Sequence, residues 1–153
     1  MTQRMTAADY RAYMSKPTTA RPAVVGLVAP LVPAGVRQVV FPGRVPGNNG
    51  AGGLLRLHWS RRQKLLSNYE WVAAAARLAP ITGPVRLELE RHSIGTHMDY
   101  DNLVSTGKLL IDALVRQKVL PDDSPAVIAE RAYTQVRAAG KAYQQTIIRL
   151  IPL

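Results

Sequence analysis

The chain of 153 residues contains no cysteine. It therefore has no disulfide framework, no thiolate zinc site and no cysteine nucleophile. It also lacks any stretch approaching 18 apolar residues without a charge or a helix breaker, so we expect no membrane-spanning helix and no membrane partner. The beginning of the chain has no uninterrupted apolar run of the signal-peptide kind. We expect a protein of the cytoplasm.

Acidic residues are scarce, because ten Asp and Glu stand against twenty Lys and Arg, which gives a net charge of +10. A small domain this basic usually binds a polyanion, and nucleic acid is the partner we expect, although a basic surface can also serve solubility alone. Half of the acidic residues are Asp residues between positions 99 and 123. Clustered carboxylates repel one another unless a cation lies between them, and Asp oxygens suit Mg²⁺ or Mn²⁺.

The distribution of proline divides the chain into two parts. Residues 1–34 are predicted to be a partly mobile N-terminal extension, because four prolines interrupt it after a short helix over 7–15. A strand over 24–28 is the other element expected there. Residues 35–153 are predicted to form one domain.

Hydrophobic periodicity in the domain predicts strands over 36–41, 84–91, 127–136 and 146–151, and helices over 60–78 and 102–117. The order β-α-β-α-β-β indicates an α+β fold with a small mixed sheet of about four strands and two main helices. The last two strands are expected to form a hairpin around residues 138–141. Ser60 is predicted to begin the first helix through a capping box with Gln63, and Asp101 or Asn102 to cap the second.

Two features precede the second predicted strand. Residues 43–53 are rich in Gly, Asn and Pro but lack the Gly-Lys-Ser/Thr ending of a phosphate-binding loop, so a mobile loop beside a site and a plain connector both stay open. Basic residues gather at the start of the first helix and before it, where they are candidates for DNA phosphate contacts or for a solvated basic face. These residues are Arg44, Arg56, Arg61, Arg62 and Lys64.

The second predicted helix carries a polar stripe. Asp99 and Asp101 are two apart in an extended segment before it, so both carboxylates face one side. Ser105, Lys108 and Asp112 follow Asp101 at spacings of four, three and four. Asp122 and Asp123 come after the helix, which spans roughly 24 Å, so they reach the first two Asp residues only if a strand returns alongside. Taken one by one, these features are typical of a helix cap, a turn and an intrahelical ion pair.

In this order the motifs are more specific. They read Asp99-Tyr-Asp101-Asn102-Leu103, Lys108-Leu-Leu-Ile-Asp112-Ala-Leu114 and Asp122-Asp123-Ser124. The pattern resembles the RusA family of Holliday-junction resolvases of bacteria and phages, over roughly residues 36–151. The resemblance implies a homodimeric, Mg²⁺-dependent endonuclease of recombination and repair that cuts four-way DNA junctions symmetrically. It also implies Asp99, Asp101 and Asp123 as catalytic metal ligands and Lys108 as the essential lysine.

One departure from the family pattern concerns Lys108, which lies seven residues after Asp101 and thus farther from it than in the founding member. Two helical turns keep the two residues on one face. Two alternatives to the resolvase remain: a metal-dependent nuclease acting on other branched or flapped DNA, and a non-catalytic DNA-binding protein with a structural Asp cluster. For the homodimer, the closing strand over 146–153 is predicted to offer an apolar surface.

Overall fold

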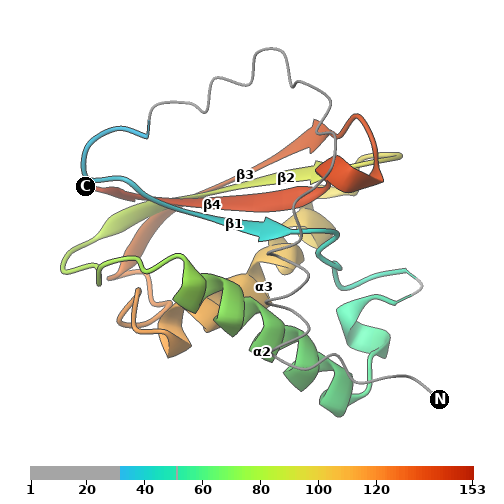
Figure 1. Cartoon of the computed structure of the whole chain (residues 1–153), viewed down its shortest axis with the longest axis horizontal. Helices are drawn as coiled ribbons and strands as arrows, with labels where there is room; N and C mark the ends of the chain where they lie inside the picture. The colour runs from blue at the N-terminus through green and yellow to red at the C-terminus, as the bar shows by residue number, and fades with distance from the viewer. Residues whose placement is uncertain (1–31, 51) are drawn as a thin grey trace, which may run out of the picture. The chain divides into compact units, whose positions relative to one another are not determined.

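The computed structural model describes residues 32–50 and 52–153, and Val32–Leu153 form one compact unit. The helix and strand predicted within residues 1–31 lie outside the described residues. The strands are β1 (Arg37–Pro42), β2 (Val85–Ser93), β3 (Ile128–Arg137) and β4 (Gln145–Pro152). The helices are α2 (Trp59–Ala75) and α3 (Tyr100–Arg116), with short 3-10 turns η1 (Leu54–Arg56) and η2 (Lys141–Tyr143). The predicted α+β fold and element order are confirmed (Figure 1).

The four strands form one mixed sheet in the order β1-β4-β2-β3. β4 is antiparallel to both of its neighbours, and β2 is parallel to β3. Parallel neighbours need a long crossover, which α3 provides. The predicted hairpin of the last two strands is wrong, because β2 lies between them. Alternation along a strand fixes which side chains face the core, but it does not choose the partner strand.

Both helices pack on the same face of the sheet (Figure 1). β2 alternates strictly, so Val85, Leu87 and Leu89 are buried toward the helices while Arg86 and Glu88 face away. The register continues this core into β4, where Leu150 pairs with Leu87 and Ile148 with Leu89. The main hydrophobic core therefore lies between the sheet and the two helices.

Helix α2 begins earlier than the sequence pattern indicates. Its N-cap is His58, whose ring nitrogen Nδ1 accepts a hydrogen bond from the backbone N–H of Ser60 at 3.4 Å. The predicted capping box at Ser60 is wrong, because an imidazole nitrogen two residues earlier takes the capping role. Farther along, Tyr69 packs edge-on against Phe41 of β1 with ring centroids 5.8 Å apart, and burial raises the pKa of its hydroxyl to about 12.

Helix α3 is capped by Asp99, whose side chain accepts a hydrogen bond from the backbone N–H of Asn102 at 2.8 Å. The cap is therefore two residues before the earlier of the two predicted positions. Gly107 faces the sheet, where an added Cβ would lie 3.1 Å from Leu89 Cδ1 and 3.3 Å from Tyr133 Cε1. The absence of a side chain at this position lets α3 lie close to β2 and β3. No helix in the part of the chain described here is long and apolar enough to cross a membrane.

Candidate functional site

The polar stripe predicted on the second helix is present on α3. Asp101 and Lys108 are exposed, and Ser105 and Asp112 are half-buried. The opposite side of the helix is buried against the sheet and α2. The residues of that side are Leu103, Thr106, Gly107, Leu110, Ile111, Ala113 and Leu114. The apolar spacing of α3 thus presents its hydrophilic residues outward as one row.

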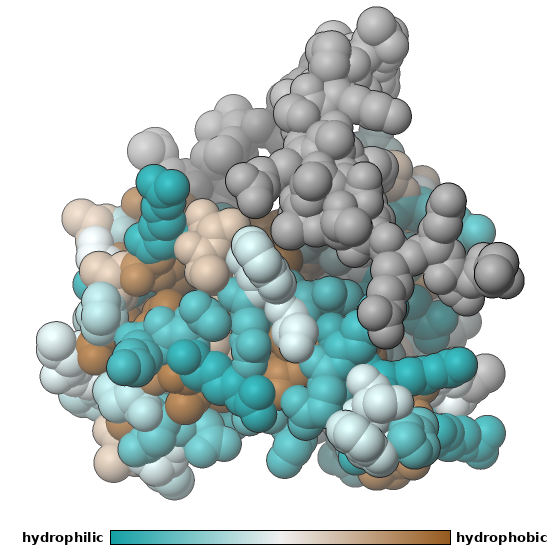
Figure 2. All heavy atoms as spheres, turned by 60° about the horizontal axis from the view of Figure 1, so that its bottom comes forward, coloured by the Kyte–Doolittle hydropathy of each residue, from teal (hydrophilic) through white to brown (hydrophobic). Residues whose placement is uncertain are grey.

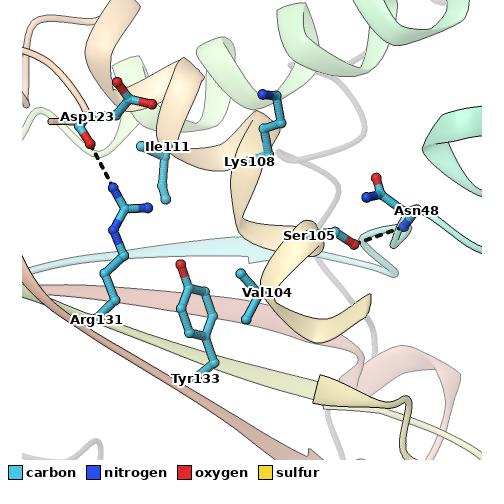
Figure 3. Close-up of a pocket in the computed structure, with 8 residues that line it drawn as sticks. All are labelled: Asn48, Val104, Ser105, Lys108, Ile111, Asp123, Arg131 and Tyr133. Carbon is cyan, nitrogen blue, oxygen red and sulfur yellow. Dashed lines mark hydrogen bonds between the residues drawn. The ribbon is translucent and has the colours of Figure 1, made fainter. Parts of the chain in front are cut away.

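An open cavity of about 270 Å³ lies along this row (Figure 3). It is lined by Asn48, Val104, Ser105, Lys108, Ile111, Asp123, Arg131 and Tyr133. Figure 3 shows Lys108 and Ser105 on α3, Asp123 and Arg131 on one side of them, and Asn48 on the other. Lys108 and Asp123, which the sequence motifs single out separately, therefore meet at one cavity.

Asp123 reaches the cavity because the chain turns back along α3 before entering β3. Lys118, with φ of 58°, adopts a left-handed conformation after the helix, and Leu120 is fully buried beyond it. Asp122 closes the following turn by accepting a hydrogen bond from the backbone N–H of Ser124 at 2.7 Å. Hydrogen bonding to the Ser124 side chain, and then to its backbone, lowers the pKa of the Asp122 carboxyl. The two neighbouring carboxylates therefore differ in role: Asp122 shapes the turn, and Asp123 lines the cavity.

Arg131 is a site residue that the sequence motifs do not indicate. Its guanidinium donates a hydrogen bond from Nη2 to the backbone carbonyl of Asp123 at 2.7 Å. Arg131 and Tyr133 are two residues apart on β3, so their side chains share the face that looks toward α3. No sequence signal could have found Arg131, because its partner in the site is a backbone carbonyl.

The charges around Lys108 influence one another. Burial raises the pKa of the Asp112 carboxyl above its usual range, Lys108 opposes that rise, and Asp123 adds to it. Lys108 also lies one helical turn before Asp112, where an opposite charge is a favourable neighbour. Lys108, Asp112 and Asp123 thus form one electrostatic group at the cavity.

The part of the loop that contains Asn48 and Asn49 lies beside α3 and is attached to it. Asn48 donates its backbone N–H to Ser105 Oγ at 2.9 Å, and Asn49 donates its own to Asn102 Oδ1 at 3.2 Å. Gly47 makes the approach possible, because a Cβ there would lie 2.2 Å from Asn102 Oδ1. The loop therefore contributes Asn48 to the lining of the cavity, and its predicted mobility stays a prediction.

Asp99 and Asp101 lie at the N-terminal end of α3, and both are exposed. Neither lines the cavity that holds Asp123, and Lys108 is roughly 10 Å along the helix axis from Asp101. Among residues 32–50 and 52–153, no three His, Asp or Glu side chains come together as a ready metal site. The structure thus unites Lys108 with Asp123 but does not gather Asp99, Asp101 and Asp123 into one group.

The predicted DNA contacts occupy the segment from the loop to the start of α2. Arg44, Arg56, Arg61 and Lys64 are exposed, and Arg62 is half-buried. None of these five residues forms an ion pair with an Asp or Glu of the described chain. Figure 2 views the molecule from the side that bears α2, where hydrophilic residues cover much of the visible face. Positive charge there is available to a polyanion.

Comparison with models of known protein families and with curated proteins finds no match to this chain.

Proposed function

We propose that this protein is a Mg²⁺-dependent endodeoxyribonuclease that resolves four-way DNA junctions by paired, symmetric phosphodiester cleavage. One observation carries the proposal. Lys108 and Asp123 come from separate segments, and both line one open cavity on the polar side of α3. A cation and a carboxylate beside an open cavity, in a chain of net charge +10, suit a phosphodiester substrate.

The metal would be held by Asp99, Asp101 and Asp123. Their donor chemistry fits, because Mg²⁺ prefers carboxylate oxygens, and it usually keeps several waters while using only one or two carboxylates with substrate phosphate oxygens. A preformed group of three carboxylates is therefore not required before DNA binds. When bound, Mg²⁺ supplies positive charge and a water of lowered pKa.

The remaining work falls to residues of the chain itself. The Lys108 ammonium donates hydrogen bonds to a phosphate oxygen and offsets the negative charge that grows in the transition state. Asp112, one turn farther along α3, places a carboxyl group next to Lys108 on the same side of the helix. Arg131 fixes the backbone at Asp123 and thereby the direction of that carboxylate.

Nicking of labelled DNA tests the proposal. Junction, flap and linear duplex substrates are incubated with the protein, with and without Mg²⁺. We expect Mg²⁺-dependent, symmetric nicking of the junction. Efficient nicking of flaps with no preference for junctions would favour the broader branched-DNA nuclease, and binding without nicking of any substrate would favour the non-catalytic DNA-binding protein.

Two neighbouring substitutions make the test specific. Asp123→Asn should lower junction cleavage by at least 100-fold, on the order expected for loss of a metal or charge-stabilising group, and leave junction binding intact or tighter. Asp122→Asn is the matched control, because an asparagine oxygen can still accept the turn hydrogen bond from Ser124. Equal loss of cleavage in both variants would mean that the turn matters and the Asp123 carboxylate does not.

A further inference from the structure

An indole ring stands exposed at the start of α2. Trp59 is the first residue of the helix and is 70% exposed, and Leu55 in the preceding turn η1 is 65% exposed. Tryptophan is usually well buried, because its large ring gains from leaving water. An exposed indole on a helix is therefore a candidate contact for a ligand.

The helix that carries Trp59 is anchored in the core. His58 caps the helix, and the imidazole and indole rings lie with centroids 5.6 Å apart at an interplanar angle of 43°. Leu66 and Tyr69, farther along α2, are buried in the core. A ligand that stacks on the indole would therefore need little ordering of the protein, which favours affinity.

Cations flank Trp59 in the sequence. Four lie within five residues of Trp59 in the sequence: Arg56, Arg61, Arg62 and Lys64. The first turn of α2 contains no acidic residue. None of the four cations is ion-paired with an Asp or Glu in the described chain, so their charge is not compensated locally.

A second exposed tryptophan on the same helix provides a comparison. Trp71 is 64% exposed, but its helical neighbours three and four residues away are Ser67, Asn68, Ala74 and Ala75, none of them charged. The two rings are equally open to solvent, and only Trp59 combines exposure with nearby cations. Exposure alone therefore does not distinguish the two positions, whereas the charge does.

We propose that Trp59 forms a binding site for an unpaired nucleobase, which stacks on the indole while Arg56, in the preceding turn, and Arg62, one helical turn after Trp59, hold the adjoining phosphates. Proteins that bind single-stranded nucleic acid combine an aromatic platform with cations that follow the backbone. A base within a duplex has both faces covered by its neighbours, whereas unpaired bases offer a free face. The site thus adds recognition of unpaired DNA to the proposed nuclease, and it rests on that function only in taking DNA as the ligand.

Binding measured in EDTA tests this site without cleavage. Fluorescence anisotropy compares a labelled oligothymidylate of about 15 nucleotides with a duplex of equal length, for the natural protein, Trp59→Ala and Trp71→Ala. Stacking of one base predicts that Trp59→Ala binds the single strand roughly 5- to 150-fold more weakly. Duplex binding should change less than about twofold, and Trp71→Ala should match the natural protein on both DNAs.

Two further arms separate stacking from damage to the helix. Trp59→Tyr should recover much of the single-strand affinity, and an abasic strand of the same length should bind the natural protein and Trp59→Ala equally. An equal loss on single strand and duplex, or no loss on either, would overturn the base site. Failure of the nuclease proposal would appear separately. The protein would then show no Mg²⁺-dependent nicking, while Trp59→Ala would still weaken binding to single-stranded DNA in EDTA.

Discussion

Glu90 links three strands on the sheet face that points away from the helices. Its carboxylate lies 3.1 Å from Arg149 Nη1 on β4 and 2.5 Å from His92 Nε2 on β2, while Arg149 also donates to Gln38 on β1 at 3.0 Å. Burial alone raises the pKa of Glu90, but the hydrogen bonds from His92 and Arg149 outweigh burial and lower it. The charged carboxylate is therefore favoured in the folded state.

The sign of this effect gives a pH-dependent prediction. A carboxyl whose folded pKa is lowered stabilises the protein above its ordinary pKa of 4.5, and that contribution is lost as the pH falls through the folded value. Glu90→Gln should lower the free energy of unfolding by about 1 kcal/mol at pH 7 and by much less at about pH 3. Urea unfolding at both pH values measures the difference. An equal loss at both values would assign the effect to packing.

At the level of single residues, the sequence predicts which residue types belong to the site better than it predicts how they are arranged. Lys108 and Asp123 follow from the motif, and the structure places both at the cavity. The motif does not show that Asp122 stays out of the cavity. The structure explains this, because the Asp122 carboxylate accepts a hydrogen bond from the backbone N–H of Ser124 in the turn. Arg131 carries no sequence signal of a site, because its contact is with a backbone carbonyl, which has no sequence signature.

The loop and α3 act together at the scale of elements. Gly47 has room for no side chain, since a Cβ would lie 2.2 Å from Asn102 Oδ1 and 3.0 Å from the Asn102 backbone oxygen. Gly47→Ala should therefore displace the loop from α3 and break the hydrogen bonds of Asn48 and Asn49. Misplacing a group near a reacting centre by about 1 Å can cost on the order of 100-fold in rate, so we expect cleavage to fall by roughly 10- to 100-fold.

The control for the loop is Gly83→Ala, because a Cβ at Gly83 meets nothing within 4 Å. Thermal unfolding and junction nicking are measured for both variants. Gly83→Ala should behave like the natural protein in both. A Gly47→Ala variant with full nicking activity would show that the attachment of the loop to α3 is irrelevant to the site.

The basic start of α2 gives a second prediction at this scale. Replacing Arg61, Arg62 and Lys64 together by Gln should weaken binding to every DNA shape. The salt dependence of binding should flatten by roughly one unit of slope for each phosphate that the variant no longer neutralises. Arg86→Gln is the control, since Arg86 faces away from the helices and is paired with Glu88 at 3.1 Å. An unchanged slope in the triple variant would leave α2 as a solvated face.

The helices and strands themselves are largely predictable, because each buries one periodic set of apolar residues. Strand pairing is not, and the expected hairpin of β3 and β4 fails for that reason: β2 pairs with both of them. Helix starts shift by one or two residues, because His58 and Asp99 cap through side chains whose reach depends on the fold.

At the scale of the molecule, β4 has no free edge to offer a partner. It pairs with β1 on one side and β2 on the other, and Thr146, Ile147, Ile148 and Leu150 are buried. Alternating apolar residues in a closing strand do not reveal whether that strand lies at an edge or inside a sheet. The homodimer itself stays a prediction, since two matched cuts require two copies of the site.

Sedimentation without DNA tests the dimer. Two copies of net charge +10 repel each other, and salt screens that repulsion, so the dimer should tighten as ionic strength rises. DNA binding should weaken under the same change, because counterions compete for the phosphates. A protein that stays monomeric at all salt concentrations, and also on a junction, would favour a nuclease that makes single cuts.

The interior place of β4 also matters for how the protein is made. The ribosome completes β1, β2 and β3 first, yet the strand that joins β1 to the others is the last described element to emerge. Pairing between the first and last strands closes a loop of about a hundred residues, which is a late and slow step. A chain halted before Gln145 has no neighbour for β1 and leaves one hydrogen-bonding edge of β2 unpaired. We expect chains halted at this point to be more open to proteases than chains that contain β4.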